Sequence, residues 1–214
     1  MEPGHNDPHK SQPQIPIQGN DGHKSQPHTP VQGNDGHKPQ PQVHIQPNIG
    51  LDSDVRSLVV EILNHILANE AVLTIKTRGA HWNVRGAGFY ELHILFDSQY
   101  KQLNDISDKI AERARMMGGI AIGSLHEFLH YTRLEEQPGV VPDILRLLSD
   151  HEISIRFLRE DARKCTEEYE DEGTFELLVS VMRIHEKMAW MLRSYIEPDS
   201  THPEKWGSLV SHSA

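Results

Sequence analysis

The sequence predicts an all-α protein built as a four-helix bundle with one long connection. Four segments within residues 51–198 carry apolar residues at the i, i+3, i+4 spacing that is typical of amphipathic helices. Glycine is absent from the interior of these segments, and their only proline is Pro142, at the start of the third. No credible series of strands is present.

The composition divides the chain near Gly50. Residues 1–50 hold nine of the 13 prolines and six of the 15 glycines, and they contain no Phe, Trp or Tyr. Such a segment cannot bury enough apolar surface to offset the entropy lost on ordering it. We therefore expect a disordered N-terminal tail over 1–50, one folded domain over 51–198 and a C-terminal extension over 199–214.

The N-terminal tail is built from repeats. Three consecutive units of 14 residues occupy 9–22, 23–36 and 37–50, and the first reads HKSQPQIPIQGNDG. Proline-rich polar sequence of this kind favours an extended, solvated backbone. Two interpretations stay open: a spacer that grew by duplication, or an arm that captures metal ions through the six histidines of the tail.

The first long helix is expected to begin near Ser53, with Asp52 or Ser53 as its N-cap, and to run to about Thr77 or Arg78. Six apolar residues recur along it at helical spacing and predict the face that it buries. They are Val55, Leu58, Val59, Ile62, Leu63 and Ile66. The second long helix is expected over 89–117, because two glycines follow it at once.

A short helix of about residues 124–132 is expected in the connection that follows. The third long helix should open at Pro142 and run to about Glu170, and the fourth should begin at Thr174 and end at Glu197. The residues expected to point inward from these two helices are Ile144, Leu147, Leu148, Ile155, Leu158, Leu177, Leu178, Val181, Ile184, Met188, Met191 and Leu192. Four long helices with one long connection predict a ferritin-type bundle.

Charge and composition narrow the class of function. The net charge is −10 and the tail, with four acids and three lysines, contributes about −1 of it, so the folded domain is acidic. An acidic domain does not bind nucleic acid by neutralising phosphates. The single cysteine, Cys165, excludes an intrachain disulfide, and the sequence shows neither a secretory signal nor an apolar run long enough to span a membrane. We therefore expect a cytoplasmic protein without a membrane span.

Five side chains of metal-ligating type fall within 32 residues: His81, His93, Asp97, Asp108 and Glu112. The last four lie within roughly a 100° arc on one face of the second helix, which turns about 100° per residue. His93 and Asp108 are 15 residues apart, which is roughly 22 Å along a helix. One metal ion therefore cannot contact both the histidine end and the carboxylate end of this face in one chain.

A two-fold axis brings the two ends together. His93 and Glu112 are centred on position 102.5, and so are Asp97 and Asp108. If the helix packs antiparallel against its own copy, the histidine end of one chain faces the carboxylate end of the other. Two identical sites result, provided that His81 folds in from the preceding segment. Imidazole and carboxylate suit iron, with one or two ions per site. We expect the internal site that Glu-x-x-His pairs form in the familiar di-iron bundle to be absent.

The motif around these residues resembles the Dps family, the miniferritins named as DNA-binding proteins from starved cells. It reads HWNVRGAGFYELHILFD over 81–97 and DKIAER over 108–113. The offsets from His81 to the other four residues, 12, 16, 27 and 31, match the family's ferroxidase pattern. The sequence HEKMAWMLR over 185–193 also resembles the family's last helix. The resemblance covers about residues 55–197 and does not extend to the repeats.

The resemblance implies a homo-oligomer, a hollow dodecamer of tetrahedral symmetry that stores ferric mineral and protects against oxidative damage. Iron(II) would be oxidised between two-fold-related subunits, with hydrogen peroxide as the preferred oxidant and O2 as the other. His81, His93 and Asp97 would come from one subunit, and Asp108 and Glu112 from its mate. Glu112 would be the strongest ligand, bridging the metal ions.

The resemblance implies two further roles. Trp82 would lie beside the metal ions, either to intercept stray oxidising equivalents or simply to pack at the interface. Acidic residues line the pores through which iron enters at a three-fold axis, and the acid-rich turn over 167–176 falls where those pores form. The candidates are Glu167, Asp171 and Glu176; an ordinary solvated helix end is the alternative interpretation.

Two other functions stay open at this point. Some family members compact DNA through lysine-rich extensions, but here the N-terminal tail is nearly neutral and residues 201–214 carry one lysine. The sequence therefore does not favour a DNA-compacting structural protein. Zinc accepts the same types of ligand, so a zinc-binding or zinc-sequestering variant is the second alternative.

Overall fold

The structure is a computed structural model that describes residues 45–197. The predictions for residues 1–44 and 198–214, which include the first two repeats and the first part of the third, lie outside the described residues. Within 45–197 the chain forms five α-helices and no strand. They are α1 (Ser53–Asn83), α2 (Phe89–Met116), α3 (Leu125–Tyr131), α4 (Ile144–Glu167) and α5 (Glu172–Ile196). The all-α prediction is confirmed.

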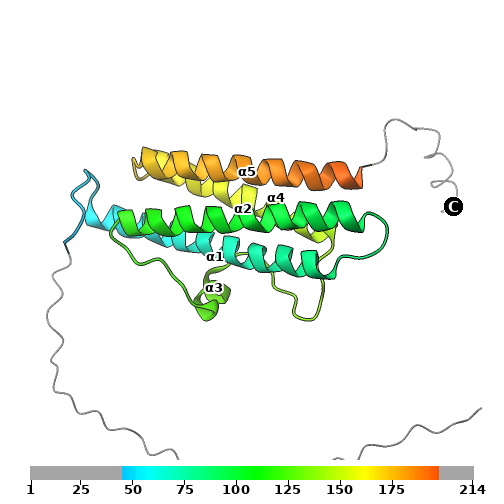
Figure 1. Ribbon diagram of the computed structural model, residues 1–214. Coiled ribbons are helices and arrows are strands. Elements are labelled where there is room, and N and C mark those ends of the chain that lie inside the picture. The colour runs from blue at the N-terminus through cyan, green and yellow to red at the C-terminus, as the bar shows by residue number, and fades with distance from the viewer. Residues whose placement is uncertain (1–44, 198–214) are drawn as a thin grey trace, which may run out of the picture. The chain divides into compact units, whose positions relative to one another are not determined.

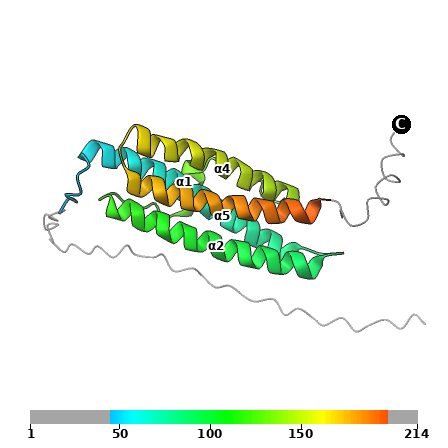
Figure 2. The same cartoon turned by 90° about the horizontal axis from the view of Figure 1, so that it is seen from above.

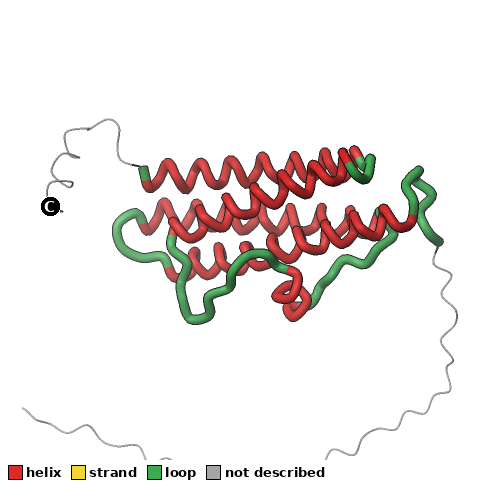
Figure 3. The backbone as a smooth tube through the Cα atoms, turned by 180° about the vertical axis from the view of Figure 1, so that it is seen from behind, coloured by secondary structure: helices red, strands yellow, loops and turns green. Residues whose placement is uncertain are grey.

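The four long helices form two pairs that pack into one bundle (Figure 1). α1 packs along α2, and α4 packs along α5. α1 and α5 run in one direction while α2 and α4 run in the other, as the colours of Figures 1 and 2 show. Because α2 and α4 are parallel, the chain must return along the bundle between them. This return carries α3 on the outside of the bundle, against α1 (Figure 3). This is the arrangement of a ferritin-type bundle.

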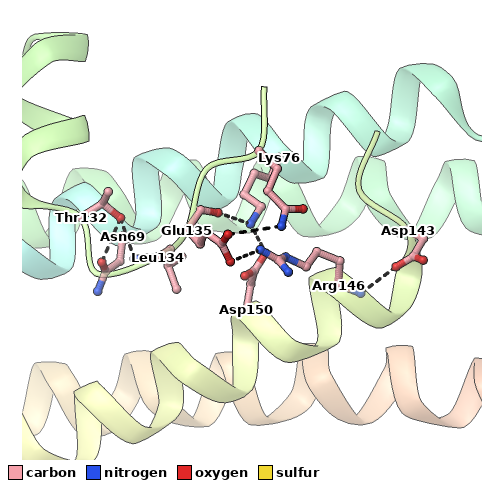
Figure 4. A network of polar contacts seen from close by, with 9 residues as sticks. Asn69, Lys76, Thr132, Leu134, Glu135, Asp143, Arg146 and Asp150 are labelled. Carbon is pink, nitrogen blue, oxygen red and sulfur yellow. Dashed lines mark hydrogen bonds and ion pairs between the residues drawn. The ribbon is translucent and has the colours of Figure 1, made fainter. Parts of the chain in front are cut away.

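The returning connection is held to α1 and α4 by polar contacts (Figure 4). Asn69 of α1 accepts hydrogen bonds at its Oδ1 from the Thr132 hydroxyl at 3.2 Å and from the Arg133 amide at 2.7 Å. Lys76 donates to the backbone carbonyl of Glu135 at 2.9 Å, and Arg146 of α4 reaches the carboxylate of Glu135 at 2.6 Å. The long connection is therefore fastened at several points.

The core draws apolar side chains from all four long helices. Leu63, Leu103, Leu147 and Leu178, one from each, are all 0% exposed. Full burial of such a side chain contributes about 1.5–3 kcal/mol relative to leaving it in water. The apolar residues that recur at helical spacing in the sequence are thus the ones that pack between the helices.

Two residues expected to point inward do not. Leu58 is 45% exposed and Met191 is 38% exposed, whereas the other predicted core residues are buried or half-buried. Each of the two lies about 100° around its helix from a neighbour, Val59 or Leu192, that does face the core. The predicted buried face therefore included one residue too many on each of these two helices.

α1 is longer than the sequence predicted, since it continues past Arg78 to Asn83. Gly79 lies inside the longer helix, although a glycine there costs about 1 kcal/mol relative to alanine. The helix continues because Ala80 is buried in the core at 1% exposed and its carbonyl accepts the Val84 amide at 2.9 Å. His81 therefore lies in the last turn of α1.

The starts of α4 and α5 are set by aspartates. Asp143 accepts a hydrogen bond from the Arg146 amide at 2.8 Å, and Asp171 accepts one from the Thr174 amide at 3.0 Å. Each satisfies a backbone donor that the first turn leaves free. Pro142 thus precedes α4 rather than opening it.

α1 is also long and apolar enough in composition to cross a membrane. However, 61% of its most apolar 18-residue window is buried inside the bundle. It contacts α2, α3 and α4, so its apolar character is that of a core helix.

Candidate metal centre

His81 and His93 meet where α1 ends and α2 begins. Their rings stack with centroids 3.8 Å apart and an angle of 21° between the ring planes. The Nδ1 of His81 lies 2.9 Å from the backbone oxygen of His93, and the Nδ1 of His93 lies 3.0 Å from the backbone oxygen of His81. A carbonyl oxygen can only accept, so both Nδ1 atoms carry a proton. Each neutral ring therefore keeps the lone pair of Nε2, the form in which imidazole binds a metal ion.

The short turn between α1 and α2 makes this pairing possible. Gly86 and Gly88 adopt φ of +88° and +77°, a left-handed conformation that glycine takes at little cost. At Gly88 a side chain would also collide with the Tyr195 hydroxyl of α5. The positive φ is the main reason for glycine at Gly88, because the exposed Tyr195 side chain could move aside.

Asp97 lies one turn of α2 beyond the histidine. Its carboxylate pairs with Lys101 Nζ at 2.6 Å and accepts a hydrogen bond from the Tyr100 hydroxyl at 2.8 Å. The contact with Lys101, followed by that with Tyr100, holds the pKa of Asp97 below its usual range. Tyr100 also meets the His81 ring edge-on, at 5.5 Å between centroids, and lies under the Arg78 guanidinium. At neutral pH this site thus offers an ionised carboxylate beside the imidazoles.

Asp108 and Glu112 lie on the same helix but far from the histidines. Both are exposed, and neither makes a side-chain hydrogen bond or ion pair with residues 45–197. Across that part of the chain, no three His, Cys, Asp or Glu side chains lie close enough to hold one metal ion. The structure thus brings His81, His93 and Asp97 to one end of the bundle and leaves Asp108 and Glu112 unengaged further along α2.

The chain resembles known proteins over the whole bundle. A family model described as a ferritin-like domain matches residues 60–200. An uncharacterised low temperature-induced protein of Nostoc sp. is 41% identical over 164 residues, which cover 72% of this chain and 92% of that protein. The DNA protection during starvation protein of Listeria innocua is 31% identical over 140 residues, which cover 64% of this chain and 90% of that protein.

A solved structure agrees with these relatives. The DPS protein of Vibrio cholerae O1 matches with a TM-score of 0.66 at 30% identity, over 71% of this chain and 97% of that one. This chain belongs to the Dps family of ferritin-like proteins. The Vibrio protein is described as a member of a broad superfamily of ferritin-like diiron-carboxylate proteins.

In this Dps protein the histidine pair is surrounded by exposed aromatic side chains. Trp82 and Tyr90 are each 70% exposed, and Phe89, which is 45% exposed, stacks on the His93 ring at 5.2 Å. Exposed aromatic residues gathered at one place indicate a surface that a partner covers. Whether Trp82 also intercepts oxidising equivalents stays a prediction.

The described chain holds one Glu-x-x-His pair, Glu127 and His130, which lies on α3. Glu127 forms a capping box with Ser124, since its carboxylate lies 2.6 Å from the Ser124 hydroxyl and 3.0 Å from the Ser124 amide. Because α3 lies outside the bundle, this pair does not provide an internal di-iron site of the kind that other ferritin-like bundles contain.

Sequence reasoning missed several titratable residues in the core, three of which lie close together. Glu70, His151 and His185 are 1%, 0% and 0% exposed. For His185 a signal was present, because it lies four residues after Val181 and three before Met188, both of which were expected to face inward. A histidine at that register must be buried with them.

Of the predicted pore residues, Asp171 has to be corrected. Its side chain is 3% exposed, and its carboxylate caps α5 and pairs with Arg113 of α2 at 2.8 Å. The carboxylate also accepts a hydrogen bond from the Thr174 hydroxyl at 2.6 Å. It is used inside the subunit, so it is not available to line a pore. Glu167 and Glu176 are exposed, and their role in a pore stays a prediction.

Replacing Asp171 by alanine should lower the free energy of unfolding by about 2–3 kcal/mol. The change removes the cap of α5 and the partner of a half-buried arginine, each of which contributes about 1–2 kcal/mol. Denaturant unfolding followed by circular dichroism measures it. The exposed Glu176→Ala variant is the control and should stay within about 0.5 kcal/mol of the parent. Equal stability of the two variants would contradict the stabilising role of the Asp171 cap and ion pair.

Proposed function

We propose that this Dps protein is an iron-storage miniferritin that oxidises Fe(II) at sites shared by two subunits. In this proposal a hollow dodecamer keeps the ferric product inside. Membership of the family supports an iron-binding oligomer. The observation that carries the proposal is the stacked His81 and His93 pair, whose Nε2 lone pairs are ready for a metal ion beside the ionised Asp97.

The rest of the ligand set comes from a second copy in this proposal. Asp108 and Glu112 are the carboxylates that the antiparallel pairing of two α2 helices brings opposite the histidines. Their exposure and their lack of partners within residues 45–197 support this role. The exposed Trp82, Tyr90 and Ile94 near the histidine pair are 70%, 70% and 51% exposed, and burying them supplies part of the driving force for the pairing.

The chemistry follows from these ligands. Carboxylates and neutral imidazoles bind Fe(II) and stabilise the higher charge of Fe(III). Two Fe(II) ions lose one electron each, and one hydrogen peroxide molecule accepts both, together with two protons, to give two water molecules. No hydroxyl radical is released in such a two-electron step. Lys101 must leave Asp97 as iron arrives, which costs little because Lys101 is 63% exposed.

Complementation between two inactive variants tests the shared site. One variant carries His81→Ala and His93→Ala, and the other carries Asp108→Ala and Glu112→Ala. Each alone should lack the fast peroxide-driven oxidation of Fe(II). In a mixed two-fold dimer one site is complete and the other has lost all four of these ligands. Random co-assembly in equal amounts should therefore restore about a quarter of the parental activity.

Two controls make the result decisive. Mixing the two variants after assembly, without subunit exchange, should restore nothing. Size-exclusion chromatography with light scattering should give the same mass for all samples. If co-assembled shells are as inactive as their components, the ligands are not shared across the interface and the proposal is wrong. Running the same assay with O2 in place of peroxide identifies the preferred oxidant.

A further inference from the structure

Three titratable side chains form a hydrogen-bonded line inside the bundle, away from the metal centre. Glu70 of α1, His185 of α5 and His151 of α4 are all at most 1% exposed. The Nε2 of His185 lies 2.9 Å from Glu70 Oε1, and its Nδ1 lies 2.9 Å from the Nδ1 of His151. One line of side chains thus joins three of the four long helices.

Both ends of this line stop at an atom without a partner. Glu70 Oε2 and His151 Nε2 are buried and make no hydrogen bond within the described residues. The only buried polar side chain on α2 is the uncharged Gln99. Other acidic groups in the interior are already paired: Asp150 with Lys76, Asp161 with Arg133 and Asp171 with Arg113. No other charge of α1, α4 or α5 is therefore free to compensate a proton added here.

The geometry limits the number of protons that the line can hold. With Glu70 ionised and both rings neutral, His185 donates from Nε2 to the carboxylate, and His151 donates from Nδ1 to His185. One further proton fits, because a charged His185 donates from both nitrogens while His151 accepts at Nδ1. A second added proton would charge both rings. Two N–H donors would then face each other between nitrogens that are 2.9 Å apart.

His151 is the ring that must stay neutral. Its complete burial, followed by the nearness of His185, lowers its pKa well below the usual range. In the unfolded chain the same ring takes up a proton near pH 6.5. The unfolded state therefore binds more protons below that pH, and the stability that His151 supports at neutral pH is lost as the pH falls. For one proton the unfolding equilibrium shifts about tenfold per pH unit.

We propose that Glu70, His185 and His151 form an acid-sensitive clasp that joins α1, α4 and α5 at neutral pH and loosens the bundle as the pH falls. The line is complete within one chain, so this inference does not rest on the proposed iron chemistry. It concerns the stability of each subunit within the assembled protein.

The variant His151→Asn tests the clasp, because asparagine keeps a donor facing His185 but cannot take up a proton. Urea unfolding of the full-length protein is measured at fixed concentration from pH 7.5 to 5.0. Between about pH 6.5 and 5.5 the unfolding equilibrium constant of the parent should rise about fivefold more than that of the variant, because half of the unfolded chains already carry the proton at pH 6.5. The control is His126→Asn, an exposed residue of α3, which should keep the parental pH dependence.

A second measurement uses only the parent protein, so it tests the proposal even if His151→Asn does not fold. Solid-state 15N NMR of the histidine-labelled parent should show His151 with a proton on only one ring nitrogen down to about pH 5. Either parallel pH profiles of the parent and His151→Asn, or a His151 ring that titrates near pH 6.5 in the folded protein, would overturn the proposal.

Discussion

Replacing both His81 and His93 by alanine should slow the fast phase of peroxide-driven Fe(II) oxidation by about a hundredfold or more. Loss of a group that merely orients a metal ligand typically costs about 10–100-fold, and this variant loses two ligands themselves. Stopped-flow absorbance of the ferric product measures the rate. The remaining Asp97 is then a lone carboxylate with Lys101 as its counter-ion.

The single variants should lose less than the double variant. Each imidazole donates a hydrogen bond to a backbone carbonyl, which remains when the ring stacked on it is removed. His93→Ala therefore leaves His81 with its own anchor and its Nε2 still ready to bind. The matched control is His126→Ala, because His126 is exposed on α3. An undiminished fast phase in the double variant, with the shell intact by light scattering, would remove the histidines from the site.

Replacing Lys76 by methionine should lower the free energy of unfolding by about 3–5 kcal/mol, the largest stability effect that we expect. Lys76 and Asp150 are 6% and 2% exposed, and their Nζ and Oδ2 atoms are 2.5 Å apart. Lys76 also holds the returning connection through the carbonyl of Glu135, as Figure 4 shows. The change leaves a buried carboxylate without its counter-ion, so α1, α4 and the connection lose their common contact.

A double variant separates the lost charge pair from the lost packing. Adding Asp150→Leu to Lys76→Met removes the unpaired charge and should recover most of the stability, since apolar replacements of buried pairs are often neutral or better. The comparison is Arg159→Met, which breaks a pair with Glu186 whose partners are 55% and 44% exposed. It should cost less than about 1 kcal/mol. The measurement is the urea midpoint of the parent and of the three variants. Equal losses of stability in Lys76→Met and Arg159→Met would contradict the importance of the buried pair.

The helices of this Dps protein were largely predictable from local sequence. The absence of glycine and proline from 89–117, with glycines directly after it, predicted a helix that the structure gives as Phe89–Met116. The order of four long helices and one short one was also predicted correctly. Near Gly79 and Pro142 the predicted ends were wrong because burial of Ala80 or a cap from Asp143 outweighed the propensity of one residue. The third long helix also ends earlier than predicted, at Glu167, and the fourth begins earlier, at Glu172.

The residues of the candidate metal centre could be proposed from the sequence, but their hydrogen-bond partners could not. The spacing placed His93, Asp97, Asp108 and Glu112 on one face of the second helix and required His81 to fold in from the preceding segment. The sequence did not indicate that each histidine would be held by the other's backbone carbonyl, because that contact depends on the turn through Gly86 and Gly88. Nor did it show that Asp171 would cap α5 and face Arg113 instead of solvent.

What the sequence determined by itself is the periodic part of this protein: the helices, their apolar faces and the register of the proposed ligands along α2. Periodicity is a property of neighbouring residues, so it can be read without knowing what the helix touches. Only the tertiary structure decided which polar groups are deprived of water. The line of Glu70, His185 and His151 comes from three helices that are distant in the chain. Its protonation depends on burial and on partners that local sequence does not specify.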